Sequence, residues 1–157
     1  MFLHDVFPPE CIIVNLESED KDEVFEEMVD FFCQVHKLDA REDILNAIRE
    51  REAKMSTGIQ KGIAIPHGKC DAVDRVYGAI GISGKGIDYD ALDGEPVYLL
   101  FLVIAPRQNT EQHLKVLKHL AELMENHQFY TDLQSQKDAQ GAYKIISKYE
   151  DMIIALE

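Results

Sequence analysis

The nine residues Val97–Ala105 (VYLLFLVIA) are the most apolar run in the chain. A helix needs about 18 to 20 apolar residues to cross a bilayer, so this run is too short to span one. Side chains of a strand point alternately to its two faces, and this run is apolar at both sets of positions. It therefore predicts a strand in the middle of a sheet that is covered on both faces.

Patterns before this run predict two helices and three more strands. Apolar residues at helical spacing indicate a helix that Ser18 caps and that ends near His36–Lys37. A second helix is expected to begin at residues 40–43, to include the charged run REREAK and to end before Gly58. Short apolar or alternating runs predict strands at residues 12–14, 62–66 and 76–83. Pro66 closes one of these strands, which leaves His67 at a strand end.

The pattern changes to helices after Pro106. Thr110 is a suitable N-cap for a helix whose expected core stripe is Leu114, Leu117, Ala121 and Met124. A last helix is expected at residues 136–154. Helices before and after the strands predict an α/β fold, a three-layer α/β/α sandwich with a central short mixed sheet flanked by helices, in a single domain over residues 1–157.

Net charge, cysteine content and the N-terminal sequence argue against several classes of protein. The formal net charge of -13 argues against nucleic acid as a partner, because such binding depends on Lys and Arg at phosphates. Cys11, Cys33 and Cys70 are an odd number without a C-x-x-C pair, which is typical of a reducing compartment. The N-terminus lacks the basic region and apolar run of a signal peptide. We expect a cytoplasmic protein without membrane insertion.

The stretch STGIQKGIAIPHGK, residues 56–69, concentrates glycines and hydroxyls around one histidine. It matches neither a phosphate-binding loop nor a dinucleotide fingerprint. His113 and His119 are six residues apart, whereas a chelating pair on a helix needs a spacing of three or four, so we expect no metal site. Two interpretations remain for His67. It either closes a strand as a structural residue or presents an imidazole in a setting that suits an anion.

Residues 51–67 also resemble a family signature. They read REAKMSTGIQKGIAIPH, which is similar to R-E-x-x-x-S-T-G-[IV]-x-x-G-[IV]-A-[IV]-P-H of the enzyme IIA domains in the bacterial phosphoenolpyruvate phosphotransferase system, of the fructose/mannitol and nitrogen-regulatory class. Residues 86–106 and 111–124 resemble later parts of the same domains. The resemblance covers essentially the whole chain, in order and with the usual spacing. Gln60 and Lys54–Met55 depart from residues that are common in the family.

The resemblance implies roles for particular residues. His67 would be the phosphoryl acceptor, with Arg51 and His113 beside it and Ser56 or Thr57 as a supporting hydroxyl. Arg49 is an alternative to Arg51 in the same charged run. His119 is expected on the surface, and His36 and His127 have no role. No cofactor or metal would be needed, and the donor would be an HPr-like phosphocarrier protein.

Three functions are consistent with the sequence. A nitrogen-regulatory IIA would bind target proteins according to its phosphorylation state, and a sugar-transport IIA would pass the phosphoryl group to a IIB domain. The chain carries no attached IIB, HPr-like or membrane segment, which favours the regulatory function. A protein-binding module that has lost transfer activity is the third possibility, and the presence of Arg51, His67 and His113 argues against it.

Overall fold

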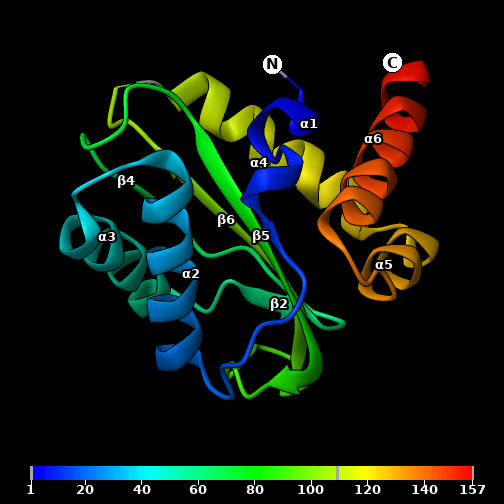
Figure 1. Cartoon of the computed structure of the whole chain (residues 1–157), viewed down its shortest axis with the longest axis horizontal. Helices are drawn as coiled ribbons and strands as arrows, with labels where there is room; N and C mark the ends of the chain where they lie inside the picture. The colour runs from blue at the N-terminus through cyan, green and yellow to red at the C-terminus, as the bar shows by residue number, and fades with distance from the viewer. Residues whose placement is uncertain (1, 109, 157) are drawn as a thin grey trace.

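The computed structural model describes residues 2–108 and 110–156 and arranges helices around one sheet (Figure 1). In chain order the elements are α1 (Leu3–Val6), the 3-10 helix η1 (Pro9–Cys11), β1 (Ile12–Ile13), α2 (Lys21–His36), α3 (Arg41–Lys54), β2 (Gly58–Gln60), β3 (Ile63–Ala64), β4 (His67–Lys69), β5 (Tyr77–Ile87), β6 (Val97–Ala105), α4 (Thr110–Met124), α5 (His127–Gln134) and α6 (Ala139–Ala155). The predicted helices and strands are largely present. No helix within the described residues has the length and apolar content that a bilayer span requires.

The sheet is mixed, as predicted. Its strand order is β1-β5-β6-β3-β2, and β4 also pairs with β6. β6 runs antiparallel to β5 and parallel to both β3 and β4. Because β3 and β4 pair with successive parts of β6, the chain between them stays close to the central strand, and His67 lies opposite Val103.

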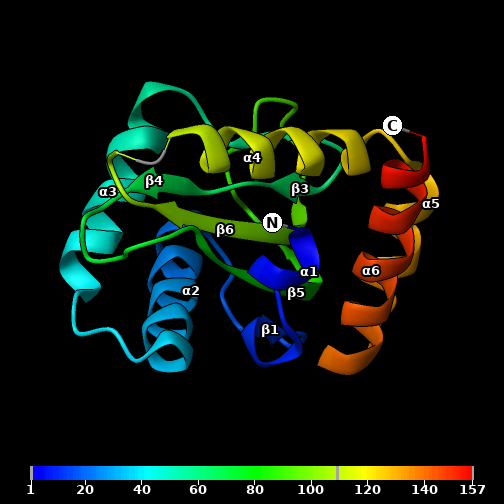
Figure 2. The same cartoon turned by 90° about the horizontal axis from the view of Figure 1, so that it is seen from above.

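The central strand β6 is buried on both faces, which confirms the prediction from its sequence. Leu99, Phe101 and Val103 belong to a core that includes buried residues of α4, α5 and α6. Leu100, Leu102 and Ile104 belong to a second core with α2 and α3. Figure 2 shows α4 and α2 on opposite sides of β5 and β6. The three-layer α/β/α architecture is therefore confirmed.

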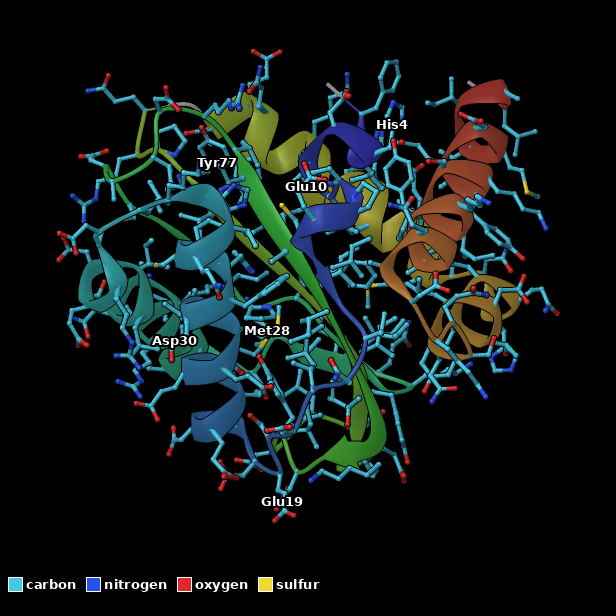
Figure 3. The ribbon with its side chains drawn as sticks, viewed as in Figure 1. His4, Glu10, Glu19, Met28, Asp30 and Tyr77 are labelled. Carbon is cyan, nitrogen blue, oxygen red and sulfur yellow. The ribbon has the colours of Figure 1, made fainter. Side chains whose placement is uncertain are left out.

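The helix α2 has one face buried against the sheet and one face exposed to solvent. Met28 is 1% exposed and lies against the sheet, whereas Asp30 is exposed. Figure 3 shows Met28 between α2 and β5 and Asp30 on the outer side of the helix. His4 of α1 lies beside α6, where its Nδ1 is 2.8 Å from Glu150 Oε1 (Figure 3). The apolar face of α2 thus covers the sheet while Asp30 faces solvent, whereas Glu150 of α6 is buried beside α1.

The predicted core stripe of α4 is wrong by one residue. The buried residues of this helix are His113, Val116, His119, Leu120 and Leu123. Leu114 is instead 60% exposed. The buried stripe includes His113 and His119, and it is rotated from the predicted stripe by one position, about 100° around the helix. His119, which was expected on the surface, is only 5% exposed.

Some predicted element ends also differ from the structure. Ser18 does not cap α2, because Asp20 accepts the hydrogen bond from the Glu23 backbone N–H and the Ser18 hydroxyl donates to Glu27. The backbones of Glu19 and Lys21 form hydrogen bonds with the backbone of Asp88, which keeps the segment up to Asp20 extended, so the helix begins at Lys21. Likewise, α6 begins after its cap Asp138, and α4 begins at Thr110 itself. The sequence prediction missed α1, η1, β2, β4 and α5.

Candidate functional site

His67 is the first residue of β4 rather than the end of the preceding strand. It lies opposite Val103, whose side chain faces α4, so the imidazole is directed to the α4 face of the sheet. Its Nδ1 lies 2.7 Å from the backbone oxygen of Ile65. Since a carbonyl oxygen only accepts, Nδ1 carries the proton and Nε2 of the neutral ring carries the free lone pair.

Gly68 allows the strand to approach α3 closely. Its neighbour in register is Ile104, on the face of α2 and α3. A Cβ at Gly68 would lie 2.9 Å from the backbone C and O atoms of Ala47 in α3. Backbone atoms cannot move aside as a flexible side chain can, so this position requires glycine. Close packing of β4 on α3 brings the last turn of α3, with Arg51, to the histidine.

Replacing Gly68 by alanine should lower the free energy of unfolding by about 1 to 3 kcal/mol, because the new methyl group overpacks the contact with Ala47. Chemical denaturation followed by circular dichroism would measure this change. Gly84→Ala is the matched control, since a Cβ there meets nothing within 4 Å. Equal stability of the two variants would show that the close approach is not limiting.

Three of the residues predicted for the site meet in one cavity of about 600 Å³. Its lining includes Arg51 from α3, His67 from β4 and His113 from α4. The rings of His67 and His113 have centroids 5.6 Å apart and planes inclined at 71°. Arg51 is partly buried, and its Nη1 donates to the backbone oxygen of Met55 at 2.7 Å. Arg49 is exposed and lines none of this cavity.

The two histidines of the site are held neutral by their surroundings. Burial lowers the pKa of His67 below its ordinary value, and the Arg51 charge adds to this effect, although the Ile65 carbonyl and Glu52 oppose it. Burial lowers the pKa of His113 to about 4, with a further contribution from His67 and Lys69. Both rings therefore have a nitrogen lone pair available at neutral pH.

His113 has an unusual hydrogen-bonding state. Its side chain is 4% exposed, and within the described residues its Nε2 is a buried polar atom that lacks a hydrogen-bond partner. Leaving such a group without a partner costs about 1 to 3 kcal/mol. A buried polar atom that lacks a partner at the wall of a cavity indicates a group with which a ligand can form a hydrogen bond.

Three further cations line the same cavity, and none of them was predicted to belong to the site. They are Lys54, Lys69 and Arg107, and Thr110 at the start of α4 lines it as well. Lys69 follows His67 by two residues on β4, which places both side chains on one face of the strand. The two-residue spacing of His67 and Lys69 could have been recognised in the sequence. In a chain with a formal net charge of -13, this cluster makes the cavity suitable for an anion.

The two predicted hydroxyls do not enter this cavity. The Ser56 hydroxyl accepts from the Gly58 backbone N–H at 3.1 Å. Thr57 is 2% exposed, and its hydroxyl bonds to Glu52 and Tyr89. A second cavity of about 360 Å³ includes Thr57 and Gln60, together with Arg51 and His67. In the described residues no group of three or more His, Cys, Asp or Glu is placed to hold a metal ion.

Comparison with known proteins identifies relatives of the chain. The family model described as phosphoenolpyruvate-dependent sugar phosphotransferase system, EIIA 2, matches residues 5–149. The PTS system fructose-specific EIIABC component of Bacillus subtilis is 33% identical over 150 residues, which are 96% of this chain but 24% of that protein. The chain thus spans about a quarter of the length of this relative.

Solved structures of other proteins share the fold. The nitrogen regulatory protein IIA-Ntr from Neisseria meningitidis has a TM-score of 0.84 and 29% identity, covering 92% of this chain and 98% of that one. Enzyme IIAMTL from Escherichia coli, in a complex with phosphorylated enzyme IIBMTL, has a TM-score of 0.74. Its identity is 15%, over 88% of this chain and 95% of that one, so this second likeness concerns the fold alone.

Proposed function

The chain belongs to the EIIA 2 family of the phosphoenolpyruvate-dependent sugar phosphotransferase system, and we propose that residues 1–157 act as one domain that carries a phosphoryl group on His67. Members of this family are components of a phosphotransferase system. The acceptor atom in this proposal is Nε2, because Nδ1 is occupied by the Ile65 carbonyl.

The observation that supports this function most strongly is the Nε2 of His113, which lacks a hydrogen-bond partner among the residues that the structure describes. It lies in the wall of the cavity that His67 enters, and the two rings are 5.6 Å apart. A phosphoryl oxygen on His67 Nε2 would accept the missing hydrogen bond. The phosphoryl group also adds about two negative charges, which the Arg51 guanidinium and the cations of the cavity can stabilise.

The transfer step follows from these positions. The lone pair of His67 Nε2 attacks the phosphorus of a phosphohistidine on an HPr-like donor, and the bond between that phosphorus and the donor nitrogen breaks. The donor imidazole keeps the electron pair of the broken bond. The His67 ring becomes positively charged while Nδ1 keeps its proton, and the Ile65 carbonyl stabilises that charge. Positioning and electrostatic stabilisation supply the catalysis.

We favour a regulatory role over sugar transport for this domain. The nitrogen regulatory protein IIA-Ntr has the higher TM-score of the two solved structures, 0.84 against 0.74 for IIAMTL. Regulated target proteins would then be the partners, besides the HPr-like donor. The three free thiols suit a cytoplasmic location, which is reducing.

Sugar transport is the second candidate, because the fructose-specific EIIABC component is 33% identical to this chain. In that case the phosphoryl group would pass from His67 to a IIB domain, by analogy with the pairing of enzyme IIAMTL and phosphorylated enzyme IIBMTL in their complex. The gathering of His67, His113 and Arg51 in one cavity argues against a binding module without transfer activity.

Incubation with radiolabelled phosphoenolpyruvate, enzyme I and HPr tests the proposed function. We expect one acid-labile phosphoryl group per chain, and an unlabelled chain would refute the carrier function. Adding purified fructose-type or mannitol-type IIB domain then separates the two roles. Loss of label to the IIB domain would favour sugar transport, and a label that stays on the chain would favour regulation.

Acceptance of the phosphoryl group should weaken in acid. The attacking ring must be neutral, and burial keeps the pKa of His67 below its ordinary value of about 6.5. The acceptor is therefore available at neutral pH and becomes protonated, and unreactive, only as the pH falls through this lowered pKa. An NMR titration of the imidazole signals would check this, and His113 should titrate near pH 4. A His67 midpoint above about 6.5 would contradict the expectation.

A further inference from the structure

Glu52, in the last turn of α3, receives hydrogen bonds from three other parts of the chain. Its Oε1 accepts from the Thr57 hydroxyl at 2.5 Å and from the Tyr89 hydroxyl at 3.2 Å. Its Oε2 accepts from the Thr57 backbone N–H at 2.9 Å and lies 3.1 Å from Lys21 Nζ. The Glu52 side chain is 7% exposed, so this carboxylate joins α3, the start of α2, the segment before β2 and the segment after β5 inside the protein.

This carboxylate is ionised at neutral pH in spite of its burial. Burial favours the protonated acid, but hydrogen bonds from Thr57 and the Lys21 ammonium outweigh it and lower the pKa of Glu52. Thr57 and Tyr89 are 2% and 0% exposed. Hydrogen bonds to a buried charged group contribute more than those between neutral groups, so the position of Thr57 is strongly determined.

Two chains of contacts lead from Thr57 to the site. In the first, the Thr57 backbone oxygen accepts from the Ile65 N–H at 3.1 Å, and the Ile65 oxygen accepts from His67 Nδ1 at 2.7 Å. In the second, Met55, two residues before Thr57, provides the backbone oxygen that Arg51 Nη1 bonds at 2.7 Å. The same short segment therefore orients both the imidazole and the guanidinium.

We propose that Glu52 is a positioning residue for phosphoryl transfer, which fixes the segment 55–57 and through it the His67 ring and the Arg51 guanidinium. This inference rests on the proposed function. Glu52 does not line the cavity of about 600 Å³, and its hydrogen bonds go to Thr57 and Tyr89 rather than to either ring of the site. Glu52 therefore acts on the geometry of the acceptor and its cation and, through its charge, on the pKa of His67, and not on the docking of the donor.

The test compares Glu52→Gln with Glu42→Gln in transfer from phosphorylated HPr. Glutamine keeps the volume of Glu52, but its amide nitrogen cannot accept the bonds that one carboxylate oxygen accepts. Glu42 is a matched control, since it lies in the first turn of the same helix with its side chain 73% exposed. We expect kcat to fall about tenfold to hundredfold in Glu52→Gln with KM for HPr unchanged, and no change in Glu42→Gln.

The NMR signals of the Arg51 guanidinium test the role of Glu52 independently of phosphoryl transfer. The hydrogen bond to Met55 should slow rotation of the guanidinium and resolve its NMR signals, and these signals should average in Glu52→Gln. If Glu52→Gln fails to fold, Thr57→Val replaces it, because it removes only the hydroxyl of the same network. Unchanged Arg51 signals, or a change in KM alone, would overturn the positioning role. An unlabelled wild-type chain would refute the carrier function instead, and the Arg51 signals would still decide the role of Glu52.

Discussion

Replacing His67 with alanine should abolish labelling of the chain by phosphoenolpyruvate, enzyme I and HPr. In the proposed reaction the imidazole forms the bond to phosphorus, so no other group of the site can compensate for its loss. His113 lies next to it but has its pKa lowered to about 4 and a buried Nε2, which is placed to bind an oxygen rather than to attack an incoming donor. Gel autoradiography after the reaction would measure the loss.

His127→Ala is the control for this experiment. It removes an exposed imidazole at the start of α5 that lines neither of the two cavities at the site, and it should be labelled as the wild-type chain is. Label that persists in His67→Ala would contradict the assignment of the acceptor. Circular dichroism would establish that both variants are folded.

Replacing Arg51 with alanine should lower the rate of phosphoryl acceptance about 100-fold to 1,000-fold. A fixed donor to the charge that develops in the transition state is worth this much when it is removed. The guanidinium already donates a hydrogen bond to the Met55 backbone oxygen, so it needs little reorganisation when the phosphoryl group arrives. Arg51→Lys should recover part of the rate, because lysine keeps the charge and loses the planar fork. Rapid-quench measurements with phosphorylated HPr would give these rates.

Arg49→Ala is the matched control for Arg51, with the same change two residues away on α3. Its side chain is exposed and lines neither of the two cavities at the site. It should transfer at the rate of the wild-type chain. If Arg49→Ala were the slower variant, the choice between these two arginines would have to be reversed.

The sheet could be predicted from sequence because every residue of its central strand is apolar. Val97–Ala105 is apolar throughout and too short for a bilayer, which leaves burial on both faces as the consistent solution. The strands β1, β3 and β5 and the helices α2 and α3 follow from spacing in the same way, whereas β2 and β4 were not predicted. The pairing of β4 with β6 does not follow from spacing, since it depends on a contact between segments more than 30 residues apart.

The face of α4 could not be predicted for a physical reason. Histidine is found both in cores and on surfaces. The sequence prediction placed Leu114 in the core and His119 on the surface, whereas Leu114 is exposed and both His113 and His119 are buried. The role proposed for His113 came from a family resemblance, and only the three-dimensional structure placed its ring 5.6 Å from that of His67.

The hydrogen-bond network around Glu52 could not be predicted from sequence either. The signature includes this glutamate, but Lys21 and Tyr89 lie 31 and 37 residues from it along the chain. Nothing in local spacing indicates that they meet at one carboxylate. Of the departures from the family pattern, Gln60 lines the second cavity, Lys54 lines the first, and Met55 is exposed.

Heteronuclear NMR of the phosphorylated chain tests the central claim most directly, because coupling to phosphorus identifies the modified nitrogen. We predict one phosphoryl group, on Nε2 of His67, while Nδ1 keeps its proton and its bond to the Ile65 oxygen. A phosphoryl group on Nδ1 of His67, or on any other residue, would contradict the account.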